Sequence, residues 1–230
     1  GDQFYIQNHL AWSLPVWSVL VLGVILVLAP ITWRWRSVGL VCVLLAYLPL
    51  RDWAKPEVAQ GDYRVMVLDV GQGLSVVVQT QNHTLLYDTG AAYRSGFNLA
   101  DAVVLPYLAS QGIESLDTLI VSHGDNDHAG AAQQIVANIP VQRVLAGEPG
   151  RLTITAEACQ AGQSWQWDGV HFAVMHPGVE AAGNSNNRSC VLLVRNASGA
   201  SLLPGDIEST AERVLLDHIA PYAPLSLVVV

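Results

Sequence analysis

The chain has 230 residues, enough for one large domain or two small ones and enough to bury a hydrophobic core. Hydrophobic residues make up 51% and charged residues only 13%, and mean hydropathy is +0.34, which argues against disorder and indicates that part of the chain avoids water. The 19 acidic and 11 basic residues leave a net charge of −8, which excludes a generic cationic nucleic-acid surface.

Two apolar segments open the chain. Residues 14–33 contain no charge and have about the length that a helix needs to cross a membrane, although a buried core helix is the alternative. Residues 37–50 form a shorter apolar segment, which follows Arg34 and Arg36 and stops before Arg51. We predict two transmembrane helices joined by a cytoplasmic turn that carries Arg34 and Arg36, with membrane lipid as a partner. The chain after this segment is then expected on the extracytoplasmic side of the cell inner membrane.

From residue 63 onward, short β-branched runs alternate with Gly, Asn and Asp turns, which is typical of an α/β domain. We therefore divide the chain into a membrane segment (1–51), a linker (52–62) and this domain (63–230). The predicted strands are 63–68, 74–80, 84–87, 116–121, 143–146, 170–175, 190–195, 201–203 and 226–230. The predicted helices are 99–111, 129–138 and 207–218, the last started by Asp206.

The domain is more acidic than the whole chain. Residues 57–230 contain 17 Asp and Glu against seven Arg and no Lys. Something cationic is expected to offset this charge, and two divalent metal ions would do so.

A dense cluster of possible metal ligands follows the apolar segment 116–121. Four of the six residues from 123 to 128 have side chains that are hard or borderline metal ligands. They are His123, Asp125, Asp127 and His128. Imidazole together with carboxylate suits Zn²⁺ or Mn²⁺, and additional carboxylate shifts the preference toward Mn²⁺. A solvated polar turn is the alternative interpretation.

Two further carboxylates occupy equivalent places, because Asp88 and Asp206 each follow an apolar run and lie next to or near a glycine. Taken singly, either could be a turn-forming aspartate. Together with the His123–His128 cluster, they predict three loops at strand ends that converge on one site.

These motifs carry a resemblance. The pattern His123-x-Asp125-x-Asp127-His128 resembles the H-x-H-x-D-H signature of the metallo-β-lactamase fold, with Asp in place of the second His. Residues 88–90 (Asp-Thr-Gly) and 205–206 (Gly-Asp) resemble two other motifs of that fold. Residues 68–73 (Leu-Asp-Val-Gly-Gln-Gly), residues 186–192 and the apolar segments narrow the resemblance to the ComEC family of DNA-internalisation competence proteins. It implies an αββα sandwich preceded by transmembrane helices. In that family the last strand is followed by a His-containing segment that supplies a ligand, so we interpret the chain as a C-terminally truncated fragment.

The resemblance also implies roles for individual residues. His123 and Asp125 would bind one metal ion, Asp127 and His128 would bind a second, and Asp206 would bridge the two. Asp88 would orient the loop that carries the His123–His128 cluster. Asp127 or Asp206 would act as the proton acceptor. The third motif falls at Asn186–Ser189, where the fold often has a His; Asn186 and Ser189 are its uncertain ligand candidates. Arg188 and Arg94 are candidate phosphate contacts, with solvated arginine as the alternative.

The function that the resemblance implies is metal-dependent hydrolysis of DNA phosphodiesters during natural transformation, with degradation of the strand that is not transported. Two divalent ions, Mn²⁺ or Zn²⁺, would be the cofactors. Single-stranded DNA and other components of the uptake machinery would be the partners. A DNA-guiding module without catalysis and a small-molecule hydrolase of the same fold are the alternatives.

Three further features are a pair of cysteines, a glycine-rich segment and a pair of tryptophans. Cys159 and Cys190 could pair in an extracytoplasmic domain, but Cys190 lies in an apolar segment, and we expect two free thiols. Residues 71–73 (Gly-Gln-Gly) are expected to form a hairpin turn, although Gln72 could face the metal site. Trp165 and Trp167 are expected to pack in the domain, with a platform for base stacking as the alternative.

Overall fold

The computed structural model describes residues 13–30, 32–52, 58–178 and 183–229. The chain divides into two compact units, residues 1–56 and residues 57–230. The predicted linker, 52–62, contains this boundary, and its residues 53–57 lie outside the described residues.

The first unit is a pair of packed helices, α1 (Ser13–Leu28) and α2 (Trp33–Asp52). They approach closely at two glycines: a Cβ on Gly23 would lie 2.9 Å from the Gly39 carbonyl oxygen, and one on Gly39 would lie 2.7 Å from the Gly23 carbonyl oxygen. The Arg36 guanidinium donates a hydrogen bond to the Ala29 carbonyl oxygen (3.1 Å) and so closes the turn between the helices. Among the described residues, no helix is both long and apolar enough to span a membrane, so the two predicted spans stay predictions.

The first sheet of the second unit contains six strands in the order β1-β2-β3-β4-β5-β6. They are β1 (Arg64–Val67), β2 (Val76–Gln79), β3 (Thr84–Tyr87), β4 (Leu116–Val121), β5 (Val141–Ala146) and β6 (Glu157–Ala158). Strands β1 to β3 pair antiparallel, whereas β3 to β6 run parallel. The carboxyl ends of β3, β4 and β5 therefore meet at one edge, where the loops that carry Asp88, His123 and Glu148 begin.

The second sheet contains five strands in the order β11-β10-β9-β8-β7. They are β7 (Ser164–Trp167), β8 (Val170–His176), β9 (Val191–Arg195), β10 (Ala200–Leu203) and β11 (Leu227–Val228). Neighbouring strands are antiparallel except β10 and β11, which are parallel. Strands β6 and β7 were not predicted: β6 has only two residues, too few for an alternating pattern to be recognised, whereas β7 does alternate, as Ser-Trp-Gln-Trp.

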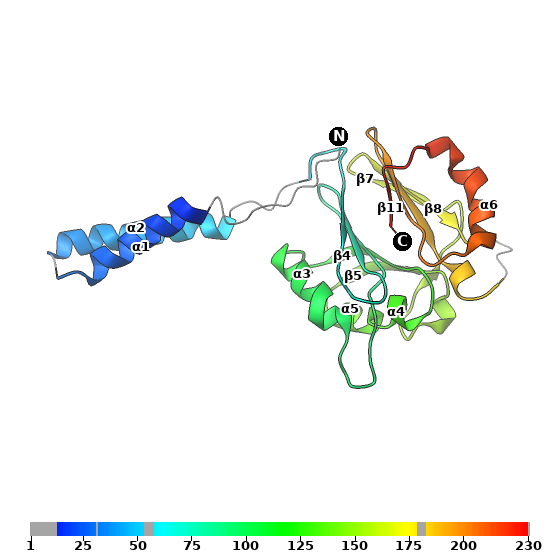
Figure 1. Ribbon diagram of the computed structural model, residues 1–230, viewed down its shortest axis with the longest axis horizontal. Coiled ribbons are helices and arrows are strands. Elements are labelled where there is room, and N and C mark those ends of the chain that lie inside the picture. Colours follow the sequence, from blue (N-terminus) through cyan, green and yellow to red (C-terminus); the bar gives the residue numbers. More distant parts are fainter. Residues whose placement is uncertain (1–12, 31, 53–57, 179–182, 230) are drawn as a thin grey trace. The chain divides into compact units, whose positions relative to one another are not determined.

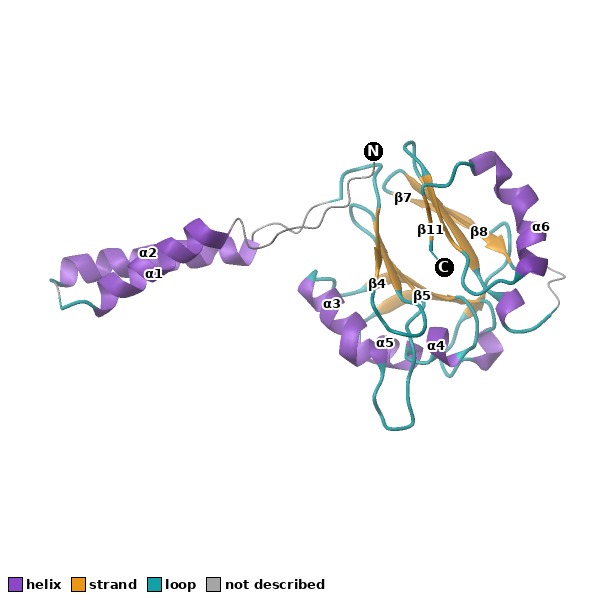
Figure 2. Cartoon of the chain, viewed as in Figure 1, coloured by secondary structure: helices purple, strands orange, loops and turns teal. Residues whose placement is uncertain are grey.

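The two sheets face each other and helices cover their outer faces (Figures 1 and 2). Leu85, Ile120, Phe172 and Leu192 belong to the apolar layer between the sheets. A second layer packs the first sheet against its helices, and a third packs the second sheet against α6 (Ser209–Ile219). Burial of each such large side chain stabilises the fold by about 1.5–3 kcal/mol. This order of layers agrees with the predicted αββα sandwich.

The helices differ in detail from the prediction. Their bounds are η1 (Ala100–Val104), α3 (Leu105–Ser110), α4 (Asn126–Ala129), α5 (Ala132–Asn138), η2 (Pro149–Arg151), η3 (Asn186–Arg188), α6 (Ser209–Ile219) and η4 (Ala220–Tyr222). The predicted helix 99–111 consists of the π-helical η1 followed by α3, and Pro106 lies in the first turn of α3, where a missing N–H costs nothing. Helix α6 begins after Glu208 rather than at Asp206, whose N–H donates instead to Ser189 Oγ (3.3 Å).

The expectation of two free thiols in the domain was wrong. Cys159 and Cys190 form a disulfide with their Cα atoms 5.7 Å apart. Cys190 is fully buried, as its apolar segment predicted, and Cys159 directly follows β6 in the facing sheet. The sequence pattern could not show this proximity, because it arises only when the two sheets stack. Within the described part of the chain, Cys42 is the remaining cysteine and is free.

Candidate metal centre

The loop from Ser122 to Asp125, called the metal loop below, connects β4 to α4 and lies at the edge of the first sheet. Strand β4 is almost entirely buried, so it carries the two residues that follow, Ser122 and His123, into the interior with 0% and 1% of their surfaces exposed. Asp125 has extended backbone dihedral angles and precedes the short helix α4. Its helical turn brings His128 back beside His123, with ring centroids 4.3 Å apart.

Asp88 organises the inner side of this loop. It follows β3, is fully buried, and has a left-handed backbone conformation with φ of 59°. Its carboxylate accepts hydrogen bonds from Ser122 N–H (2.6 Å) and Ser122 Oγ (2.7 Å), and contacts His128 Nδ1 at 2.8 Å. A buried carboxylate requires such partners. Because Nδ1 is occupied, His128 presents Nε2 toward Asp206, whose Oδ1 lies 3.2 Å away.

His123 is held in a similar way. Its Nδ1 lies 3.0 Å from Ser122 Oγ and 3.4 Å from Ser189 Oγ, which leaves Nε2 facing Asp125 Oδ2 at 3.6 Å. Ser189 is fully buried and also accepts the hydrogen bond from Asp206 N–H. Ser189 therefore contacts both the side chain of His123 and the backbone of Asp206.

Three of the five predicted ligands have ligand atoms that lie close together. His123, His128 and Asp206 each offer one ligand atom, and these atoms all lie within 4.8 Å of one another. Asp127 Oδ2 lies 4.0 Å from His128 Nε2, which places a further carboxylate at the rim. Imidazole nitrogens and carboxylate oxygens gathered in this way fit Zn²⁺ or Mn²⁺.

The two histidines differ in their affinity for protons. Burial lowers the pKa of His128, but the hydrogen bond with Asp88 and the charges of Asp88, Asp206 and Asp127 outweigh this effect and raise it to about 9. Burial, together with the positive charge of His128, lowers the pKa of His123 from its ordinary value. A metal ion that binds His128 must therefore displace a firmly held proton.

The remaining candidates are Asn186, Arg188 and Arg94. Asn186 opens the short helix η3 and is half-buried. Arg188 ends η3, is half-exposed, and has Nη1 3.4 Å from Glu148 Oε1. Arg94 is exposed on the loop after β3, between Tyr93 and Phe97, whose backbones are joined by a 2.8 Å hydrogen bond.

The predicted turn at residues 71–73 is confirmed, because β1 and β2 pair antiparallel on either side of it. Gly73 has φ of 117°, and a Cβ there would lie 2.2 Å from the Asp127 carbonyl oxygen. Only glycine allows this approach, so the turn packs against α4, the helix that contains Asp127. Gln72 at its tip is exposed.

Glu148 and Arg151 were not predicted from the sequence. They lie on the loop that follows β5, the strand beside β4, so their position after a neighbouring parallel strand was the signal that could have identified them. Arg151 Nη2 lies 3.0 Å from Asp125 Oδ1, and Arg151 Nη1 lies 3.0 Å from Glu148 Oε2.

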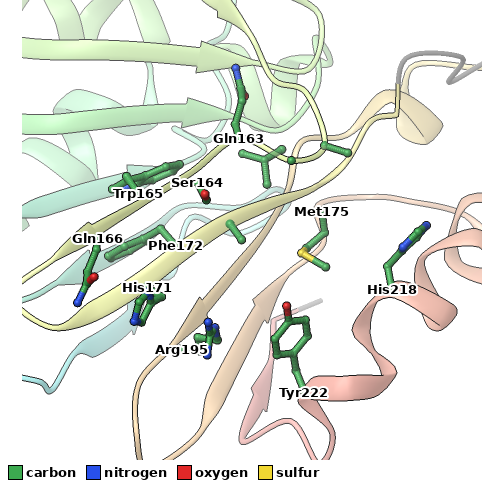
Figure 3. Close-up of a pocket in the computed structure, with 14 residues that line it drawn as sticks. Gln163, Ser164, Trp165, Gln166, His171, Phe172, Met175, Arg195, His218 and Tyr222 are labelled. Carbon is green, nitrogen blue, oxygen red and sulfur yellow. The ribbon is translucent and has the colours of Figure 1, made fainter.

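A separate cavity of about 830 Å³ lies on the second sheet, and Figure 3 shows the side chains that line it. They include Arg195, His218 and Tyr222, and none of the converging ligands. Trp165 also lines it, but its ring stacks on Phe172 with the centroids 5.3 Å apart, as expected for a packing role.

Comparison with protein families matches residues 68–227 to the metallo-β-lactamase superfamily. The chain belongs to this superfamily. Membership indicates a metal-dependent hydrolase with a site for divalent metal, which agrees with the donor set described above. The Rm3 metallo-β-lactamase has the same fold, with a TM-score of 0.50 at 15% identity over 76% of this chain and 77% of that one.

Among curated proteins, the chain is similar to competence protein ComA of Neisseria gonorrhoeae, with 37% identity over 90% of this chain and 28% of that protein. It is also similar to recombination protein 2 of Haemophilus influenzae, with 35% identity over 77% of this chain and 22% of that protein. These relatives and the family match confirm the resemblance to the ComEC family. The chain spans about a quarter of the length of the curated relatives that it matches.

Proposed function

We propose that the unit formed by residues 57–230 hydrolyses DNA phosphodiesters during DNA uptake, using two divalent metal ions. The observation that carries this proposal is the convergence of His123, His128 and Asp206, with Asp125 and Asp127 beside them. Relatives named as competence and recombination proteins support DNA as the substrate. Degradation of the strand that is not transported would be its role in natural transformation.

The distances support a division of the ligands into two sets. His123 and Asp125 face each other across 3.6 Å and would hold one ion, while His128 and Asp127 face each other across 4.0 Å and would hold the other. Asp206 lies 3.2 Å from His128 Nε2 and within 4.8 Å of the ligand atom of His123, so it would bridge the two ions.

The bound ions, Mn²⁺ or Zn²⁺, would supply an activated water and neutralise charge on the scissile phosphate. The chain's own residues provide the rest. Asp127 and Asp206 have 37% and 46% of their side chains exposed, so either can accept a proton from a water that enters from solvent. Arg188, which has a half-exposed guanidinium, would contact a phosphate of the incoming strand.

The helical hairpin would attach this unit to the membrane. Its exposed surface is dominated by large apolar side chains, which include Val21, Leu22, Ile25, Leu28, Trp33 and Leu40. An apolar surface of this kind requires lipid or apolar protein as its neighbour. Fractionation of cells that express the chain would test this, with recovery in the membrane pellet after a carbonate wash as the expected result.

The Cys159–Cys190 disulfide supports an extracytoplasmic location for the unit, because disulfides persist in oxidising compartments and are rare in the cytosol. We expect Cys159 and Cys190 to resist alkylation in intact cells until a reductant is added. Thiols that react after denaturation without any reductant would contradict this location. Cys159→Ala together with Cys190→Ala provides the control for reagent that reaches Cys42.

The decisive experiment is an assay of the full chain on a labelled single-stranded oligonucleotide with Mn²⁺ or Zn²⁺. We expect metal-dependent cleavage that Asp127→Asn abolishes. Glu212→Gln, which removes the same charge from the exposed face of α6, is the matched control and should cleave normally. A folded, metal-loaded chain that binds the oligonucleotide without cutting it would overturn the nuclease and favour a DNA-guiding module.

A further inference from the structure

The two oxygens of Asp125 have different neighbours. Oδ2 faces His123 Nε2 at 3.6 Å, on the side of the converging ligands. Oδ1 forms an ion pair with Arg151 Nη2 at 3.0 Å. A single guanidinium thus occupies one carboxylate oxygen and leaves the other available.

Arg151 is itself held by Glu148, whose side chain is only 8% exposed. Glu148 Oε2 accepts hydrogen bonds from Arg151 Nη1 (3.0 Å), from Gly124 N–H (3.2 Å) and from the Ser185 hydroxyl. These bonds outweigh the effect of burial and keep the pKa of Glu148 below its ordinary value. One anchored carboxylate therefore ties the guanidinium to the backbone of the metal loop.

The metal loop has a glycine, Gly124, where the Arg151 side chain passes over it. A Cβ on Gly124 would lie 2.8 Å from both Arg151 Cδ and Arg151 Nε. The absence of a side chain at position 124 lets the arginine cross directly over the loop and reach Asp125. The close passage of Arg151 therefore explains why a glycine suits position 124, between His123 and Asp125.

We propose that Arg151, anchored by Glu148, is a positioning residue that holds Asp125 with one oxygen turned toward His123, so that Asp125 binds metal through that oxygen. An aspartate can rotate about two side-chain bonds, and fixing it before the metal arrives removes that cost from binding. The guanidinium also offsets the repulsion between Asp125 and the neighbouring carboxylates. This inference rests on the proposed metal site and adds to it the residue that orients one ligand.

Calorimetric titration of Mn²⁺ into the full chain tests the inference without any assay of activity. We expect Arg151→Ala to weaken one of two metal-binding events by about 10–100-fold, the usual effect of removing a group that orients a ligand. Arg151→Lys should recover part of the loss, because an ammonium keeps the charge but not the two-pronged geometry. Arg143→Ala breaks a comparable exposed ion pair with Glu157 (2.7 Å) and should leave both events unchanged.

A double-mutant cycle shows whether Arg151 acts through Asp125. In an Asp125→Ala background, adding Arg151→Ala should leave the remaining metal-binding event unchanged. An equal loss in both backgrounds, or no loss in either, would overturn the inference. If the wild-type chain binds two ions and Arg151→Ala has no effect, only the role of Arg151 fails; if the wild-type chain binds none, the proposed metal site fails with it. The Arg151→Lys variant keeps the test valid if Arg151→Ala does not fold.

Discussion

The candidate metal centre has two halves that differ in how they are held. The buried half consists of Asp88, Ser122, His123 and His128, each at most 3% exposed and joined by hydrogen bonds of 2.6–3.0 Å. The exposed half consists of Asp125, Asp127 and Asp206, with 37–46% of their side chains exposed. The buried half is positioned by the fold, whereas in the exposed half Asp125 forms an ion pair with the exposed side chain of Arg151.

This difference predicts that the largest effect comes from the buried half. Asp88→Ala would leave Ser122 and His128 without their partner and remove one member of a buried charged pair. We expect the free energy of unfolding to fall by about 3–5 kcal/mol, measured by denaturant titration. Metal affinity should also fall by about 10–100-fold in the protein that remains folded.

Asp88→Asn separates the loss of the Asp88 charge from the loss of the whole polar side chain. Asparagine tolerates the left-handed backbone conformation at this position, so the change removes the charge without straining the chain. It should unfold less readily than Asp88→Ala but bind metal with similar weakness. Full metal affinity in Asp88→Asn would contradict a role for the carboxylate in orienting His128.

The pH dependence should have opposite signs for stability and for metal binding. In the folded chain the pKa of His128 is about 9, above its value near 6.5 in an unfolded chain. Its contribution to stability is therefore complete below about pH 6.5 and is lost as the pH rises through about 9. Metal binding must displace the same proton, so apparent affinity should rise by about tenfold per pH unit over this range.

Chelator-treated protein examined by thermal unfolding, and calorimetry at several pH values, would measure the two trends. The buffers should differ in ionisation enthalpy, so that the proton released on metal binding is counted directly. Metal affinity that is constant from pH 6.5 to 9 would show that His128 is not a ligand.

The smallest effect is expected at the rim. Arg188 is half-exposed and its ion pair with Glu148 is long, so Arg188→Ala should leave folding and metal binding unchanged. KM for the oligonucleotide should rise about two- to fivefold with kcat unchanged, as for loss of an exposed charged contact of up to about 1 kcal/mol. A fall in kcat instead would place Arg188 at the reacting phosphate.

Much of the candidate centre could be predicted from the sequence because four of its five proposed ligands lie within the six residues from His123 to His128. Strand β4 and the turn of α4 are formed by local interactions, and they determine that His123 and His128 lie side by side. The position of Asp88 after an apolar strand was equally informative, because parallel strands bring their carboxyl ends to one edge. The alternation of strands and helices predicted only an α/β domain, and the order of the four layers was expected from the resemblance to the metallo-β-lactamase fold.

Other features were decided by the tertiary structure, because they join segments that no local pattern relates. Cys159 and Cys190 meet only because the two sheets stack, so the apolar pattern around Cys190 predicted its burial but not its bond. Arg151 reaches Asp125 across a glycine from the loop after a neighbouring strand. Periodicity in a sequence reports which face of a strand or helix is buried, but which segments meet across space depends on how those faces pack.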